Sequence, residues 1–263
     1  MLSLYKNSDE QDVAQPTTAS KNINGITAML DPQYLPHLKN NFWYAQLSPA
    51  YQHYILEHAR LQHVQKDQSI FLSGDSFNGI YAVLEGAVRL GYIDIHGKEA
   101  LAAIAEPIMW FGEISLVDQQ PRSHDAIAMQ KSAILHLPSS CIQQLVNVHP
   151  QFWFHIAQLT SQKLRFAFLE LISIQTQNIT QRLAQRLLFI LNGYGNHIEI
   201  EQHCIHLSQE QLAQLLVCSR QTVNQELQEL ERLGVLKVAF RKIEILDTVL
   251  LHRIAHAFPQ TEI

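Results

Sequence analysis

The chain has 263 residues, of which 19 are Lys or Arg and 24 are Asp or Glu, so its formal charge is −5. Hydrophobic residues make up 47% of the chain and charged residues only 16%. This composition excludes disorder of the whole chain and allows two domains, each with a core. The acidic balance argues against a general polyanion binder, and the low charge indicates apolar surface that an oligomer would cover.

The sequence contains no run of 18 apolar residues, so it predicts no membrane-spanning helix and no membrane partner. The N-terminus, Met1–Lys6, lacks the apolar core of a signal peptide, and we therefore expect a cytoplasmic protein. Cys141, Cys204 and Cys218 are widely spaced and form no CxxC pair. They suit a reducing compartment and predict neither a disulfide framework nor an iron–sulfur cluster.

The first half of the chain divides into a tail and a β-rich domain. Residues 1–30 lack periodic apolar residues and predict a flexible tail, and a domain follows over 31–148. Ser48-Pro49 predicts the start of a helix to about Leu61. Residues 64–137 show short apolar stretches separated by glycines, for example 80–84 and 87–90 on either side of Glu85-Gly86. This pattern predicts a barrel or jelly roll.

A single long helix is predicted next, over 150–177 within a segment 149–177. It contains almost no Gly or Pro, and apolar residues recur every three or four positions. Its apolar content exceeds one stripe, so the helix needs two partners. We expect its own barrel to cover one face and the same helix of a second copy to cover the other, as a dimerisation helix in a homodimer.

The last segment, 178–263, has the element order of a winged helix-turn-helix. Helices are predicted over 179–192, 209–216 and 220–233, followed by a hairpin over 235–246 with its tip at Phe240-Arg241-Lys242. The fold class is therefore α+β: an N-terminal double-stranded β-helix (jelly roll), a long dimerisation helix and a C-terminal winged helix-turn-helix.

The predicted second helix of this motif has a polar face suited to DNA. Ser219 can cap it, and Val223, Leu227 and Leu230 face inward at helical spacing. Arg pairs with guanine and Asn or Gln with adenine in the major groove, whereas hydroxyls bind phosphates. An ordinary polar surface helix is the alternative. The predicted DNA-binding residues are Ser208, Ser219, Arg220, Gln221, Thr222, Asn224 and Gln225.

The segment 218–223 resembles the recognition helix of the CRP/FNR transcription regulators, and the resemblance extends over about residues 45–250. It implies that Arg220, Gln221 and Gln225 read bases in a palindromic operator, and that RNA polymerase is a further partner. Val217 departs from the glycine usual in that turn. A β-branched residue at positive φ is strained, so we expect a turn of different shape.

The charge of this domain sets an expectation for DNA affinity. Residues 207–263 carry six basic and seven acidic side chains, a net charge of −1. Few phosphates are neutralised per monomer, so nonspecific binding should be weak and specificity should rest on base contacts made by a dimer.

A second motif covers residues 110–116 and 121–123. Gly112 permits close approach of a ligand, Glu113 can accept from hydroxyls, and Arg122 offers a fork to a phosphate. The stretch resembles the phosphate-binding cassette of cyclic-nucleotide-binding domains. That resemblance implies that Glu113 holds a ribose hydroxyl and that Arg122 and Ser123 hold the cyclic phosphate of cAMP or another cyclic nucleotide. The predicted ligand-binding residues are Gly112, Glu113, Ile114, Arg122, Ser123, His124, Ala167 and Phe168.

Four positions depart from the nucleotide-binding pattern: His124, Asp125, Ala167 and Phe168. Ala167-Phe168 stands where the family's cAMP receptor has the Thr-Ser pair that contacts adenine, and neither side chain can make those hydrogen bonds. Two interpretations stay open. The β-roll senses a cyclic nucleotide, or the protein is a regulator that senses another effector or none.

Metal and catalytic sites are weaker interpretations. His203-Cys204-Ile205-His206 and the pair His252/His256 have ligand-like spacing but lack a second pair of ligands, so we expect no metal site. His124-Asp125 has no nucleophile or second carboxylate beside it. We therefore predict that the chain is not an enzyme.

Overall fold

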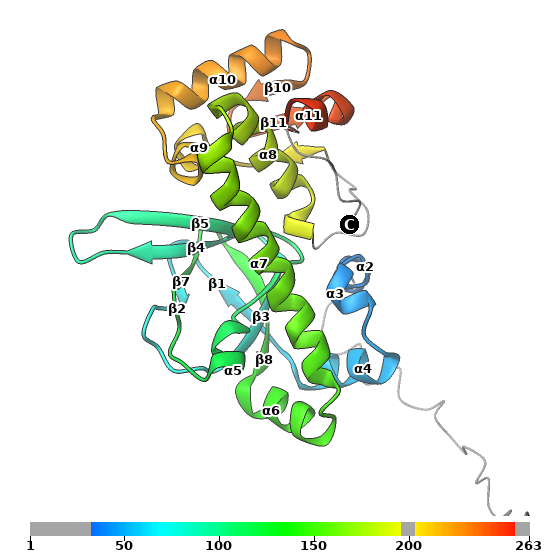
Figure 1. The fold of residues 1–263 in the computed structure, drawn as a ribbon. Helices are drawn as coiled ribbons and strands as arrows, with labels where there is room; N and C mark the ends of the chain where they lie inside the picture. Colours follow the sequence, from blue (N-terminus) through cyan, green and yellow to red (C-terminus); the bar gives the residue numbers. More distant parts are fainter. Residues whose placement is uncertain (1–32, 196–202, 256–263) are drawn as a thin grey trace, which may run out of the picture.

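The computed structural model describes residues 33–195 and 203–255, in a β-roll and a smaller helical domain joined by one long helix (Figure 1). The tail over 1–30 and His256 lie outside these described residues. No helix among the described residues is long and apolar enough to cross a membrane.

Two four-stranded antiparallel sheets face each other in the β-roll. One has the order β1 (Arg60–Val64), β8 (Ser132–Pro138), β3 (Gly79–Glu85), β6 (Trp110–Phe111). The other has the order β2 (Ser69–Phe71), β7 (Asp125–Ala128), β4 (Val88–Ile93), β5 (Glu99–Ala105). Val83, Val88 and Ile134 are fully buried between the sheets. The predicted jelly roll is confirmed.

A tight turn connects β3 to β4 at the predicted Glu85-Gly86. Gly86 joins β3 to β4 with φ of +91°, and a Cβ there would lie 2.2 Å from Ser132 Oγ. Only glycine fits both the dihedral angle and the space. The short helix α5 (Ile114–Asp118) follows β6.

Helices cover one side of the roll. They are α2 (Tyr34–Lys39), α3 (Phe42–Ala45), α4 (Pro49–His58) and α6 (Ser139–Val148). Ser48 caps α4, as predicted, by accepting from the Tyr51 amide at 3.4 Å. The Trp43 ring lies 5.1 Å from that of Trp110, and its indole nitrogen donates to the His155 carbonyl at 2.6 Å. These contacts bind the roll to the long helix.

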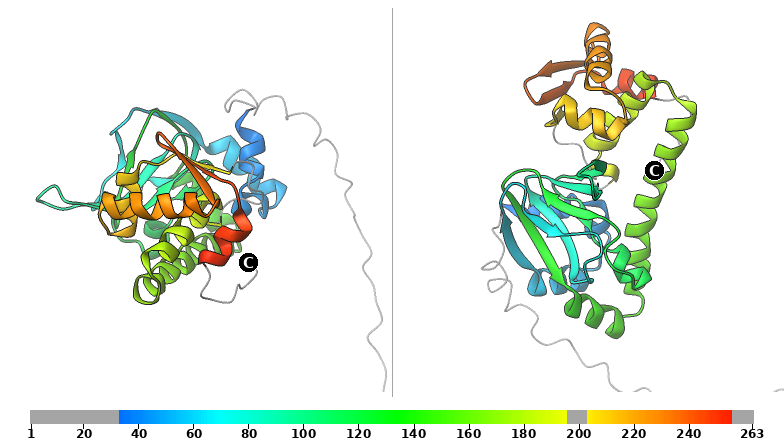
Figure 2. Two further views of the ribbon diagram at one scale, coloured as in Figure 1. Left: turned by 90° about the horizontal axis from the view of Figure 1, so that it is seen from above. Right: turned by 90° about the vertical axis from the view of Figure 1, so that its left-hand side faces the viewer.

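The long helix α7 (Phe152–Thr176) runs beside both domains (Figure 2). It matches the predicted helix 150–177 to within two residues at each end. Only Phe152, Ile156, Leu159 and Ser173 are buried. Phe166 and Leu169 are partly buried against the core, and seven other large apolar side chains are exposed: Trp153, Phe154, Leu164, Phe168, Leu171, Ile172 and Ile174.

The C-terminal domain contains α8 (Ile179–Leu191), η1 (Gly193–Gly195), β9 (Cys204–Ile205), α9 (Gln209–Leu216), α10 (Arg220–Arg232), β10 (Leu236–Ala239), β11 (Lys242–Ile245) and α11 (Thr248–Ala255). Its antiparallel sheet has the order β10-β11-β9. Helices α9 and α10 with the β10–β11 hairpin form the predicted winged helix-turn-helix, with the hairpin as its wing.

Candidate functional site

The helix-turn-helix is held by side-chain caps at both of its helices. Ser208 Oγ accepts from the Gln211 amide at 3.2 Å, and the Gln211 side chain accepts in return from the Ser208 amide at 2.8 Å. Ser219 Oγ accepts from the Thr222 amide at 3.0 Å and caps α10. These two local signals therefore place both helix starts where they were predicted.

The turn between α9 and α10 corrects one expectation. Val217 ends α9 in the left-handed conformation, with φ of 52° and ψ of 50°. The turn therefore keeps the left-handed shape although the residue is β-branched, and the expectation of a differently shaped turn was wrong. The side chain is 80% exposed, so it meets little steric resistance from its surroundings. The backbone alone bears the strain.

Helix α10 divides into a buried and an exposed face. Val223, Leu227 and Leu230 are buried, as their spacing predicts. Arg220, Gln221 and Gln225 are exposed. These three long polar side chains lie toward the N-terminal end of the helix, free to reach base edges in a major groove.

The other predicted DNA-contacting residues have partners inside the domain. Asn224 Oδ1 accepts from Gln209 Nε2 at 3.0 Å, and the Ser219 and Thr222 hydroxyls lie 2.8 Å apart. The Asn224 bond ties α10 to the start of α9. It leaves the Asn224 amide nitrogen as the group that can donate to DNA.

In the cassette, Arg122 points into the roll. Its Nη1 donates to the Gly112 carbonyl, and its Nη2 donates to the Gly79 carbonyl and to Asn78 Oδ1, each at 2.6 Å. The guanidinium carbon lies 4.2 Å from the ring centroid of Phe71. Burial lowers the pKa of Arg122. The fork predicted for a phosphate is here engaged by the protein's own oxygens.

Glu113 has a partner that sequence reasoning missed. Its carboxylate is 1% exposed, and its Oε2 lies 2.5 Å from Nζ of Lys163 on α7. Lys163 and Arg165 are the only Lys or Arg residues of α7, and Lys163 follows the buried Leu159 by four positions. A cation at that spacing faces the roll, which is the signal that could have revealed the pair.

The residues after Arg122 have different roles. The exposed Ser123 hydroxyl lies 2.9 Å from Nδ1 of His124, whose ring is half-buried against Phe71. Burial, and then the Lys163 charge, lower the pKa of His124. Asp125 accepts from the amides of Ser73 at 2.7 Å and Ile93 at 3.1 Å. Asp125 therefore connects two backbone segments and does not pair with His124.

Three buried polar atoms of the cassette have no hydrogen-bond partner among the described residues: Glu113 Oε1, Arg122 Nε and His124 Nε2. Buried polar groups are normally paired, and a bound molecule is one way to pair them. The cassette can therefore offer a guanidinium donor, a carboxylate acceptor and an imidazole nitrogen to a small polar ligand.

The remaining predicted ligand residues lie apart or play backbone roles. Gly112 adopts φ of +92°, and a Cβ there would lie 3.0 Å from Arg122 Nη1. Ile114 begins α5 and is half-buried. Ala167 and Phe168 are on the exposed side of α7, and Phe168 is 56% exposed. The long helix instead reaches the cassette through Lys163.

A polar network connects the long helix to the helix-turn-helix. The buried Arg186 of α8 forms an ion pair with Glu170 of α7 and donates to the Leu215 carbonyl at 3.2 Å. Arg182 donates to the Leu216 carbonyl at 2.6 Å. Both carbonyls are at the C-terminal end of α9, where helices lack internal donors. These bonds therefore connect α7 through α8 to the end of α9.

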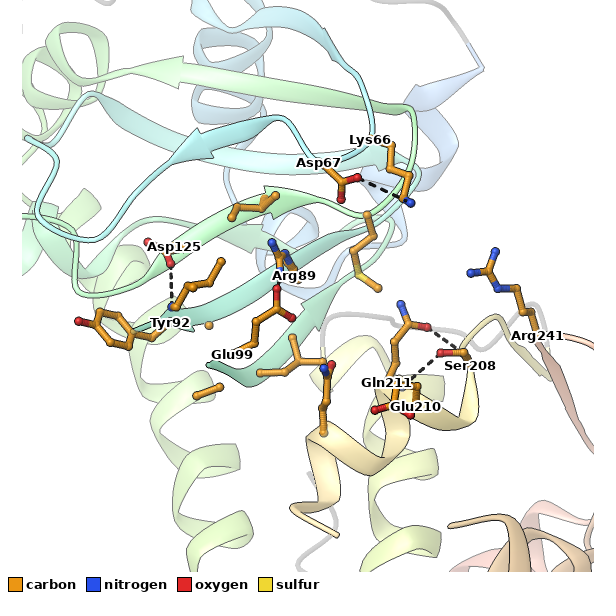
Figure 3. A pocket seen from close by; sticks show the side chains of 17 residues that line it. Lys66, Asp67, Arg89, Tyr92, Glu99, Asp125, Ser208, Glu210, Gln211 and Arg241 are labelled. Atoms are coloured by element: carbon orange, nitrogen blue, oxygen red, sulfur yellow. Dashed lines mark hydrogen bonds and ion pairs between the residues drawn. The ribbon is translucent and has the colours of Figure 1, made fainter. Parts of the chain in front are cut away.

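A hollow of about 430 Å³ lies between the two domains (Figure 3). On the roll it is lined by β4 and β5, where Arg89 pairs with Glu99. On the other side it is lined by Ser208, Gln211 and Arg241. The start of α9 and the wing thus face the β4–β5 hairpin of the β-roll.

Two family models match the chain. Residues 61–149 match a cyclic nucleotide-binding domain, and residues 181–254 match a Crp-like helix-turn-helix domain. These ranges contain the cassette and α10, respectively. The matched domains follow one another in the order that the structure shows.

Known proteins of this organisation are similar along most of their length. The cyclic AMP receptor protein of Thermus thermophilus is 33% identical over 187 residues, 71% of this chain and 83% of that protein. The global nitrogen regulator of Synechocystis is 25% identical over 192 residues, 71% and 84% of the two chains.

Solved structures show the same fold. FixK2 from Bradyrhizobium japonicum superposes with a TM-score of 0.67 at 20% identity, over 76% of this chain and 99% of its own. A CRP/FNR-family transcriptional regulator of Thermus thermophilus superposes with a TM-score of 0.57 at 27% identity, over 74% and 98%. With its cyclic nucleotide-binding-type roll, long helix and Crp-like helix-turn-helix, the chain belongs to the CRP/FNR family of transcription regulators.

Proposed function

We propose that this regulator is a homodimer that reads a palindromic operator in double-stranded DNA through Arg220, Gln221 and Gln225. The capped α10, which buries its apolar face and exposes these three side chains, is the observation that carries the proposal. The two copies of α10 in the dimer lie about 34 Å apart to enter successive major grooves. The bound dimer regulates transcription in the cytoplasm, by binding and not by catalysis, with RNA polymerase as its protein partner.

The exposed face of α7 supports the dimer. Phe154, Leu164, Phe168 and Leu171 are each more than half exposed along this helix. Such a contiguous apolar surface is costly in water and typical of a protein interface. The parallel pairing of two α7 helices covers it and explains why so few residues of the chain are charged.

The β-roll in this proposal binds a small polar effector at Glu113, Arg122, Ser123 and His124. The unpaired buried atoms of the cassette support it. An effector that accepts from Arg122 and donates to Glu113 competes with the contact from Lys163. Release of Lys163 frees α7 to shift, and the Glu170–Arg186 pair passes that shift to the recognition helix.

A regulator that senses no cyclic nucleotide is the second candidate. Arg122 already donates to three protein oxygens, and Ala167 and Phe168 offer no hydrogen bond to a base. These observations favour a roll that binds a different effector or serves as a constant scaffold.

Selection of duplexes from a random DNA pool, with and without cAMP or cGMP, tests the DNA-reading proposal. We expect one palindromic sequence to be enriched. An Arg220→Ala variant should bind it about tenfold or more weakly and lose preference at one base pair per half-site. Arg232→Ala is the matched control, because Arg232 is on the same helix but pairs with Glu229. Failure to enrich any sequence under all conditions would refute the proposal.

Calorimetry with cAMP and cGMP separates the two effector candidates. In the first, a cyclic nucleotide binds the wild type and binds the Arg122→Ala and Glu113→Gln variants at least tenfold more weakly. Binding of unchanged affinity in both variants contradicts the cassette assignment. Absence of binding to the wild type supports the second candidate.

Analytical sedimentation measures the oligomeric state and so tests the proposed dimer. A Leu171→Glu variant places a charge in the proposed α7 interface and should sediment as a monomer. Val249→Glu, at an exposed apolar position on α11, should leave the dimer intact. A wild-type protein that stays monomeric at micromolar concentration would rule out this part of the proposal.

A further inference from the structure

The tip of the wing is an apolar residue, Phe240, followed by two basic residues, Arg241 and Lys242. Ala239 pairs with Lys242, so Phe240 and Arg241 form the two-residue turn of the hairpin. Phe240 is 92% exposed, and the Arg241 guanidinium carbon lies 6.0 Å from the centroid of its ring. Arg241 adopts φ of 53°. An aromatic side chain placed at the tip of a strained turn, with no packing role in its own domain, requires another explanation.

The wing tip shares a groove with the start of the recognition helix. Phe240, Arg241 and Arg220 line one depression of about 380 Å³, together with Ser208 and Gln209. Phe240 is therefore continuous with the surface that presents Arg220 to DNA. Arg241 also lines the interdomain hollow of Figure 3, whereas Phe240 lines the groove beside Arg220 and not that hollow.

The charge at the tip favours a polyanion. Arg241 and Lys242 have no carboxylate within ion-pair distance among the described residues. Two cations and an aromatic ring at the end of a hairpin suit a duplex. The cations neutralise phosphates, and the ring packs on sugars or between base steps exposed in a minor groove.

We propose that Phe240 is a DNA-contacting residue that packs into the minor groove flanking the major groove read by α10. The inference rests on the DNA-reading function proposed above. It assigns to the wing a shape-dependent contact besides the base contacts of Arg220 and its neighbours. Operators with an easily deformed flanking step, such as TA, should therefore be preferred.

Three variants test this assignment at the selected operator: Phe240→Ala, Phe240→Trp and the control Val249→Ala, an exposed apolar residue on α11. We expect Phe240→Ala to lower affinity about tenfold, to remove minor-groove protection at the flank in a hydroxyl-radical footprint, and to abolish the preference for a flanking TA step. Phe240→Trp should retain all three properties, and Val249→Ala should behave as the wild type.

Several outcomes overturn the assignment. If Phe240→Ala binds with wild-type affinity and footprint while Arg220→Ala loses binding, the wing proposal fails and the DNA-reading function stands. If Phe240→Ala lowers transcription in a purified system with unchanged DNA binding, the tip contacts a protein, and the assignment is wrong. If the wild type selects no operator, both proposals fail.

Discussion

Replacement of Arg122 by methionine tests whether this side chain is part of the roll's structure in the absence of an effector. The substitution leaves the buried carbonyls of Gly112 and Gly79 without their donor, at a cost of about 1–3 kcal/mol each. Loss of the stacking on Phe71 adds about 1 kcal/mol. Removal of a desolvated cation recovers part of this. We expect a net loss of about 3 kcal/mol in the free energy of unfolding.

Urea unfolding followed by tryptophan fluorescence measures this loss, at one fixed protein concentration because the proposed dimer would contribute to stability. Trp43 and Trp110 are buried in and beside the roll and report on its unfolding. Arg60→Met, at an exposed position on β1, is the control and should change stability by less than about 0.5 kcal/mol. An equally small effect of Arg122→Met would refute the structural role. It would mean that the guanidinium is held for the effector alone.

Three further outcomes follow from buried charge and backbone strain. Burial raises the pKa of Glu106 to about 7, above its value in the unfolded chain. The contribution of Glu106 to stability is therefore present near pH 4.5 and is lost as the pH rises through 7, by at most about 3 kcal/mol. Urea titrations at several pH values measure this fall in the free energy of unfolding, and Glu106→Gln should remove it. Lys163→Met leaves the Glu113 carboxylate buried without its cation and should destabilise the roll by about 2 kcal/mol. The added Glu113→Gln change should restore most of this loss. A double-mutant cycle in urea measures the coupling, and simple addition of the two effects would contradict the prediction. Val217→Gly relieves a left-handed β-branched residue and should stabilise α9 and α10 by about 1 kcal/mol, seen as slower amide exchange, whereas Val217→Ala should gain little.

Predictions from the sequence were correct where the interactions that decide the structure join residues close together in the chain. The starts of α4, α9 and α10 were correct because Ser48, Ser208 and Ser219 bond to amides three residues away. The buried face of α10 was correct because its period is a property of the helix itself. Val217 was the exception, since the domain tolerates a local strain that an isolated turn would avoid.

The sequence predicted which residues belong to the candidate site, but not which residues pair with one another there. The cassette residues and the exposed face of α10 could be identified from the motifs. The Glu113–Lys163 pair joins positions 50 residues apart, and Arg122 finds its acceptors at Asn78 and Gly79, more than 40 positions earlier. Such pairings depend on how the sheets and α7 come together: helical spacing indicates that Lys163 faces the roll, but not which residue it meets there.

The low charge of the chain corresponds to one place in the fold, the exposed apolar face of α7. The sequence by itself determined the order of domains, the length of the long helix and the polar residues of the recognition helix, because capping, periodicity and turn chemistry act within a few residues. Only the tertiary structure decided that Arg122 points inward, that Lys163 neutralises Glu113 and that Phe240 shares a groove with Arg220. Each of these depends on segments that are distant in the chain and meet only when the roll, the helix and the wing have packed.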